Sequence, residues 1–153
     1  MAGTSTGTTD ASVFAASTLV GTWTYRSFVS NPDLSADFNS LEFGRANLRF
    51  DPAPMDTLTG LIYGQGWQLK LKGSINYGNP FEIRFQGTGV VNGSEWIYDY
   101  VGYVVRPWPN GVDQRPAIVG SIVRTIPHPS GGGGTSPAGV VAQWIAVRQD
   151  PSS

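Results

Sequence analysis

The chain has 153 residues, of which 40% are hydrophobic and 12% aromatic, a content typical of one globular domain with a buried core. Charged residues make up only 14%, and the net charge of −1 gives no basic surface of the kind that binds nucleic acid or an anionic membrane. Cysteine is absent, which excludes disulfides, thiol catalysis and thiolate metal sites.

The sequence also bears on where the protein works. No stretch approaches the ~20 apolar residues of a membrane-spanning helix, so we expect no membrane insertion of that kind. No basic residue precedes Arg26, so the start of the chain lacks the charged region of a secretory signal. We therefore expect a cytoplasmic protein, although a secreted protein whose signal has been removed has the same features.

Strand-like segments follow one another along most of the chain. The first 12 residues are rich in glycine, threonine, serine and alanine and are predicted to form a flexible segment, so the folded domain is expected to span residues 13–150. Eight predicted strands occupy residues 19–28, 41–50, 58–63, 67–75, 80–87, 95–105, 117–126 and 139–149. Helical periodicity of useful length is not found.

The alternation of side chains indicates which faces are buried. In residues 67–75 the aromatic and aliphatic side chains fall on odd positions, and glutamine, lysine and serine fall on even ones. Residues 80–87 repeat this pattern, and in the first strand the odd face, with Trp23 and Tyr25, is predicted to point inward. One wet and one buried face are typical of an antiparallel sheet.

The number and spacing of these strands predict the architecture. Short connections favour an all-β, single eight-stranded antiparallel up-and-down barrel, because a meander that closes on itself leaves no exposed edge. Eight strands leave an interior wide enough for side chains or for one small ligand. The alternative is a two-sheet β-sandwich.

The first and last predicted strands carry a family resemblance. Gly21-Thr22-Trp23 begins the first long strand, and Arg148 lies in the last strand. In these residues the chain resembles the calycin superfamily of lipocalin- and avidin-type barrels. The resemblance implies a lipocalin-like barrel in which Arg148 packs across Trp23, with a small hydrophobic ligand in its lumen.

Three long connections interrupt the regular pattern. Residues 30–40 are polar and long for a hairpin, so they are interpreted either as a lid or binding segment or as a plain surface connection. Residues 106–116 contain three prolines and place Trp108 between two of them. Residues 127–138 contain a run of four glycines and are predicted to be flexible.

The sixth predicted strand holds the main candidates for catalysis. Asp99 lies between Tyr98 and Tyr100, and a buried carboxylate there would have a raised pKa suited to acid or base catalysis. If Trp96 and the two tyrosines point inward, Asp99 faces solvent; in the opposite phase it lines the lumen. Arg124 is the fourth candidate, since a buried arginine needs an anionic partner, such as Asp99.

The remaining polar and aromatic residues suggest weaker sites. His128 is the single histidine and lies between two prolines, so a metal site of the common histidine-rich kind is not expected, nor is any cofactor. Glu42, Arg45 and Arg49 form either a second polar site or a wet sheet face. Aromatic residues supply large contact areas for a ligand, and the candidates are Trp23, Tyr25, Trp67, Trp96, Trp108 and Trp144.

Three functions are compatible with these features. The first is binding of a small hydrophobic or aromatic molecule in the barrel. The second is a cofactor-free enzyme, such as a cyclase or isomerase, that orients a hydrophobic substrate and excludes water. The third is a structural or interaction domain whose interior is filled by side chains. Sparse charge and abundant aromatic residues also suggest a homo-oligomer.

Overall fold

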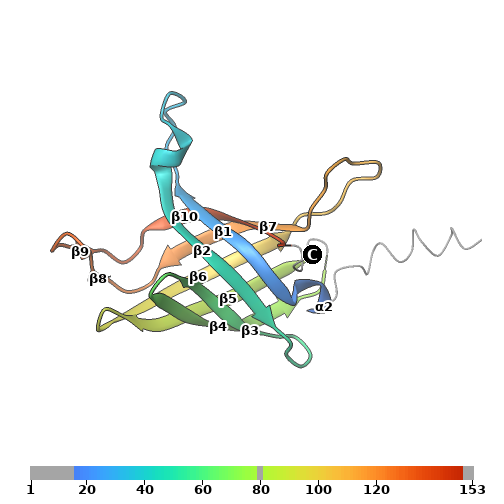
Figure 1. The fold of residues 1–153 in the computed structure, drawn as a ribbon, viewed down its shortest axis with the longest axis horizontal. Helices are drawn as coiled ribbons and strands as arrows, with labels where there is room; N and C mark the ends of the chain where they lie inside the picture. Colours follow the sequence, from blue (N-terminus) through green and yellow to red (C-terminus); the bar gives the residue numbers. More distant parts are fainter. Residues whose placement is uncertain (1–15, 79–80, 150–153) are drawn as a thin grey trace, which may run out of the picture.

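Eight antiparallel strands close into a barrel in the computed structural model, which describes residues 16–78 and 81–149. The order around the barrel is β1-β10-β7-β6-β5-β4-β3-β2, so the chain forms an up-and-down meander whose last strand pairs with the first (Figure 1). The predicted barrel is therefore confirmed, and the sandwich is not formed. The strands are β1 (Gly21–Val29), β2 (Glu42–Asp51), β3 (Thr57–Gly64), β4 (Trp67–Asn76), β5 (Glu82–Val91), β6 (Ser94–Val104), β7 (Ala117–Arg124) and β10 (Val141–Val147).

A few short elements complete the described part of the chain. They are α2 (Ala16–Leu19), the 3-10 turn η1 (Phe38–Leu41), and a two-stranded ladder formed by β8 (His128–Pro129) and β9 (Thr135–Ser136). The ladder lies in the glycine-rich connection, for which the sequence analysis did not predict strands. The segment predicted to be flexible, residues 1–12, lies outside the described residues. Within the described residues, no helix is long and apolar enough to cross a membrane.

The barrel interior is lined by the side chains that the alternation predicted. In β4 the odd positions are buried or, for Trp67 and Gly73, half-buried, and the glutamine and lysine positions are exposed. In β1 the odd positions Trp23, Tyr25 and Ser27 are buried. β6 presents Tyr98 and Tyr100 to the interior and Asp99 to solvent, which settles the phase of this strand. Burial of each large apolar side chain contributes about 1.5–3 kcal/mol, so these inward faces hold the barrel together.

Two glycines allow β6 and β7 to approach each other closely inside the barrel. Gly102 and Gly120 lie opposite each other in the β6–β7 ladder. A Cβ on Gly102 would lie 2.8 Å from the ring of Trp144, and one on Gly120 would lie 1.8 Å from the carbonyl oxygen of Val101. The indole of Trp144 therefore fills the space that the missing side chain of Gly102 leaves, and the β6 backbone lies close against Gly120.

One end of the barrel is closed by α2. The Trp23 Nε1 donates a hydrogen bond to the Leu19 carbonyl at 2.9 Å, and the Arg148 guanidinium lies over the Trp23 ring at 5.6 Å. Gly21 adopts φ +133°, and a Cβ there would lie 2.9 Å from an Arg148 nitrogen, so glycine is required on both counts. The residues that carry the calycin resemblance thus meet as expected.

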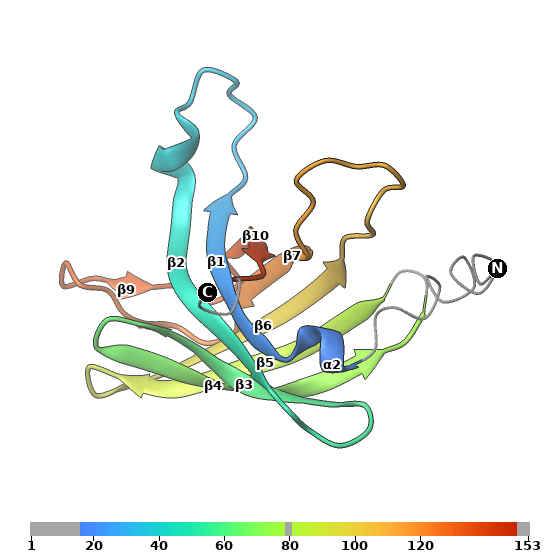
Figure 2. The same cartoon turned by 45° about the vertical axis from the view of Figure 1, so that its right-hand side comes forward.

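Two connections stand away from the barrel wall. Figures 1 and 2 show the β1–β2 connection as a long arm and the β6–β7 connection as a second projection. We call residues 30–41 the arm. At its base the rings of Phe28 and Phe38 stack with centroids 4.0 Å apart, and the Arg26 guanidinium lies over the Phe28 ring at 4.9 Å. Arg26 also bonds to Asn39, so the arm has contacts of its own.

Candidate functional site

A cavity of about 290 Å³ lies inside the barrel, and no residue of α2 is among those that line it. It is formed where the second half of β1 meets the first halves of β2, β4 and β6 and the end of β7. Its walls are mostly aromatic and aliphatic. The lining residues are Tyr25, Ser27, Phe43, Gly44, Arg45, Ala46, Trp67, Leu69, Trp96, Tyr98, Tyr100 and Ile122.

The Tyr25 hydroxyl is an unsatisfied polar group in this wall. The residue is 3% exposed, and its hydroxyl has no hydrogen-bond partner among the described residues. Burial raises the pKa of Tyr25 well above its ordinary value; the Ser27 hydroxyl is close enough to act as a hydrogen-bonding neighbour that lowers this pKa in part, but the two hydroxyls do not meet the geometry of a hydrogen bond. The Ser27 hydroxyl instead lies 3.5 Å from the Gly44 carbonyl oxygen. An unpaired buried hydroxyl costs about 1–3 kcal/mol, so a hydrogen bond from the Tyr25 hydroxyl to a polar atom of a ligand would offset that cost.

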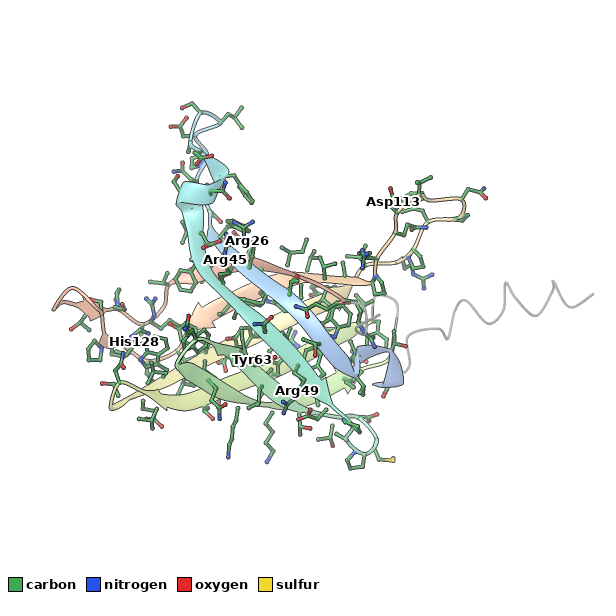
Figure 3. All side chains as sticks on the ribbon, in the orientation of Figure 1. Arg26, Arg45, Arg49, Tyr63, Asp113 and His128 are labelled. Carbon is green, nitrogen blue, oxygen red and sulfur yellow. The ribbon has the colours of Figure 1, made fainter. Side chains whose placement is uncertain are left out.

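A second polar group adjoins the cavity around the Tyr98 hydroxyl. Arg124 Nε donates to the Tyr98 oxygen at 3.0 Å, and the same oxygen lies 2.8 Å from His128 Nε2. All three side chains are at least nine-tenths buried, with exposed fractions of 6% for Tyr98, 9% for Arg124 and 6% for His128. Three elements, β6, β7 and β8, thus converge on one oxygen atom. Figure 3 shows His128 at the end of the barrel where the β8–β9 ladder lies.

The hydrogen bonds fix the position of each proton in this cluster. His128 Nδ1 lies 3.1 Å from the Pro129 carbonyl oxygen, which only accepts, so Nδ1 carries a hydrogen. In the neutral ring Nε2 is then an acceptor, and Tyr98 donates its hydroxyl hydrogen to it. The Trp96 ring stacks on the imidazole with centroids 4.0 Å apart and holds its plane. The result is a directed chain from Arg124 through Tyr98 to His128.

Arg124 lacks the carboxylate partner that the sequence analysis expected. Within the described residues it forms no ion pair, and Asp99 lies outside the barrel, bonded to Gln86 at 2.9 Å. The predicted pair of Arg124 and Asp99 is therefore wrong, because Asp99 is out of phase with Tyr98 and Arg124 points inward. Arg124 is held instead by the Pro137 carbonyl at 3.1 Å and by the rings of Phe43 and Tyr98.

Five of the ten predicted site residues line the cavity, and Arg124 bonds to one of these five, Tyr98. Tyr25, Trp67, Trp96, Tyr98 and Tyr100 line the cavity, so the structure brings five of them together. Their roles in binding or catalysis stay predictions.

The other candidates lie elsewhere. Trp23 and Trp144 belong to the packed core, and Trp144 donates a hydrogen bond to the Ser121 carbonyl at 2.9 Å. Trp108 is 77% exposed in the β6–β7 connection, and Asp99 faces solvent, so neither contacts the cavity. A lumenal position for Asp99, one of the two alternatives, is thus excluded by the phase of β6.

The charged residues of β2 form surface ion pairs. Glu42 bonds to Arg26 at 2.8 Å and to Arg45 at 2.9 Å, and Arg49 bonds to Asp51 at 2.8 Å. Hydrogen bonds from Arg45 and Arg26 lower the pKa of Glu42. These contacts agree with the wet-face interpretation, although Arg45 also reaches the rim of the cavity. Figure 3 shows Arg26 and Arg45 near the base of the arm.

His128 is the functional candidate that sequence reasoning undervalued. Its only signals were that it is the single histidine and that prolines flank it. Pro129 lies in the β8–β9 ladder, where His128 pairs with Ser136 and turns inward against β6. Among the described residues, no group of three or more histidine, aspartate or glutamate side chains is placed to hold a metal ion.

The fold and the cavity define a closed eight-stranded antiparallel barrel with an aromatic interior site, compatible with a calycin-like protein. No protein-family model matches the chain, and no curated protein or solved structure matches it significantly.

Proposed function

We propose that the protein binds a small, largely apolar molecule in the barrel cavity and that the Tyr25 hydroxyl forms a hydrogen bond with it. The observation that carries this proposal is the Tyr25 hydroxyl, buried without a partner in the wall of an aromatic cavity. A cavity of about 290 Å³ is at the small end of the range of about 300–1,000 Å³ that is usual for ligand sites. The expected ligand therefore has few rings and a polar atom on one side.

Binding is tested with a matched pair of probes. 2-Tetralone is a two-ring ketone that accepts a hydrogen bond, and tetralin has the same rings without the carbonyl. Titrations are followed by calorimetry and by quenching of tryptophan fluorescence, since Trp67 and Trp96 line the cavity. Because one hydrogen bond contributes about 1 kcal/mol, we expect 2-tetralone to bind about fivefold more tightly than tetralin. Tyr25→Phe should abolish that difference.

A blocking variant separates the cavity from the protein surface. Ala46 lines the cavity, so Ala46→Phe should fill part of it and abolish binding of both probes. Ser74 is exposed on the outer face of β4, and Ser74→Phe is the control of equal size. Binding that survives Ala46→Phe and fails in Ser74→Phe would refute a ligand site inside the barrel.

A cofactor-free enzyme is the second candidate, and the cluster around Tyr98 favours it. If the Tyr98 proton moves to His128 Nε2, the Tyr98 oxygen becomes an anion that accepts hydrogen bonds from Arg124 Nε and from the new Nε2–H. Two cationic donors stabilise such an anion in a water-poor site. Tyr98 would then remove a proton next to a ligand carbonyl and return it at another carbon, which is an isomerisation without a cofactor.

Proton exchange tests this second candidate. The protein is incubated with 2-tetralone in D₂O, and loss of the signals of the hydrogens next to the carbonyl is followed by NMR. We expect exchange at least tenfold above the buffer rate, lost in Tyr98→Phe and His128→Gln while tetralin affinity stays within twofold. Exchange no faster than in buffer would refute proton abstraction from this ketone and leave the binding function in place.

A further inference from the structure

The outer surface of the barrel has two unlike halves. On β4 and β5 the outward side chains are polar or charged except for Val90 near the end of β5, and they include Lys70, Lys72 and Arg84. On β7 and β10 the outward positions carry no charged residue. These positions are Ala117, Val119, Ser121 and Val123 in β7 and Val141, Gln143, Ile145 and Val147 in β10. An antiparallel sheet that faces water normally presents polar side chains on that face, so this half requires another explanation.

Several of these apolar side chains are open to solvent. The exposed fractions are 40% for Val119, 40% for Ile145 and 39% for Tyr103 of the adjacent strand β6. We call the outward side of β6, β7 and β10 the outer sheet face; its two exposed charges, Glu95 and Asp99, lie in the first half of β6, and Tyr103, Val119 and Ile145 lie beside one another away from them. A groove of about 1010 Å³ runs between this face and the arm, with Phe28 and Phe38 among its lining residues on the arm side. A continuous exposed apolar surface of this kind marks an interaction site.

The arm offers a matching apolar projection. Leu34 at its tip is fully exposed, and Phe38 is 60% exposed. The neighbouring Asp33 carboxylate accepts hydrogen bonds from the Ser35 backbone nitrogen at 2.9 Å and from its hydroxyl at 2.7 Å. The one charge beside the tip is therefore held within the turn, and Leu34 is the side chain presented to a partner.

We propose that the outer sheet face and the arm form a self-association surface, in which the arm of one copy lies in the groove of the other. The absence of charge on β7 and β10 favours a second copy, because identical surfaces brought together meet no like charges there. A two-fold dimer fills both grooves by reciprocal exchange of the arms.

The size of the face shows why the arm is needed. Three strands spaced about 4.8 Å apart, each rising about 3.3 Å per residue over the seven residues of β10, present a projected face of about 340 Å². A stable interface buries about 800 Å² on each partner. The sheet face alone falls well short of this area, whereas insertion of the partner's arm adds both sides of the arm and the groove walls.

Mass measurements test the association. Sedimentation velocity on the full chain should give twice the mass of 16.4 kDa at micromolar concentration. Val119→Lys on the face and Leu34→Ser at the arm tip should each weaken the dimer at least tenfold. Ser74→Lys, on the polar outer face of β4, is the control and should leave the dimer intact. Leu34→Ser keeps the test valid if Val119→Lys fails to fold, because Leu34 packs against nothing in the single chain.

Cross-linking tests the exchange of arms. The chain has no cysteine, so introduced thiols are the only ones present. Leu34→Cys protein mixed with a size-tagged Val119→Cys protein should form a mixed disulfide-linked pair under mild oxidation. If the only disulfide-linked pairs that form join two Leu34→Cys chains, the exchange of arms is refuted. A wild-type chain that stays monomeric at 100 µM would overturn self-association, and if that monomer also sedimented with phosphatidylcholine vesicles, the face would belong to a lipid surface instead.

Discussion

Two tyrosines in the cavity wall should respond to loss of the hydroxyl with opposite signs. Tyr25 and Tyr98 both line the cavity and are both buried, but the Tyr25 hydroxyl has no partner while the Tyr98 hydroxyl has two. Tyr25→Phe removes an unpaired polar atom from the interior and leaves the aromatic packing in place. Tyr98→Phe leaves Arg124 Nε and His128 Nε2 without their shared partner.

The expected sizes follow from the two environments. Because an unpaired buried hydroxyl costs about 1–3 kcal/mol, Tyr25→Phe should raise the free energy of unfolding by about 1 kcal/mol. A hydrogen bond to a charged group contributes about 1.5–3 kcal/mol, so Tyr98→Phe should lower it by about 2 kcal/mol. In a chain of this length each kcal/mol corresponds to about 2–4 °C in Tm.

Urea denaturation followed by tryptophan fluorescence measures both effects. The free energy of unfolding should fall with urea concentration at the same slope in both variants and in the wild type, so that a change in midpoint reports stability alone. Destabilisation by Tyr25→Phe would show that its hydroxyl is satisfied in the free protein. The ligand proposal would then lose the observation on which it rests.

Two further predictions concern close packing and pH. Gly120→Ala places a Cβ 1.8 Å from the Val101 carbonyl oxygen and should lower Tm sharply, whereas Gly131→Ala, with open space around it, should change Tm little. Burial raises the pKa of Tyr25 above its ordinary value of 10.0, and burial also raises that of Tyr100. Below pH 10 both states keep these protons, but at higher pH the unfolded chain loses them first, so stability should fall there. Between pH 8, 10 and 11 the urea midpoint should fall less steeply with rising pH in Tyr25→Phe than in the wild type.

The strands could be predicted because the alternation of polar and apolar side chains indicates which face of each strand is buried. It worked best in β4 and β5, where lysine, arginine and glutamine mark the wet side. It left β6 open, since that strand carries large apolar side chains on both faces: Tyr98 and Tyr100 inside, Val101 and Tyr103 outside. The apolar outer sheet face removes the contrast on which the method depends.

The site was harder to predict than the fold. Trp67, Trp96 and Tyr25, three of the aromatic candidates, line the cavity, but composition also selected Trp108, which is exposed in a connection. Arg124 was recognised as unusual, yet its actual partners are a hydroxyl, a carbonyl and two rings. His128 has no periodic context at all, and only the β8–β9 ladder turns it inward.

The sequence by itself determined the strands, their order as a meander and the inward face of β1, β4 and β5, because these depend on neighbours within a few residues. The tertiary structure decided which inward side chains meet. That depends on how the strands are staggered when the barrel closes, which brings Tyr25, Trp67, Tyr98 and Arg124 to one end. Closure also decides which hydroxyl finds a partner and which does not, and the cavity exists only as a consequence of that arrangement.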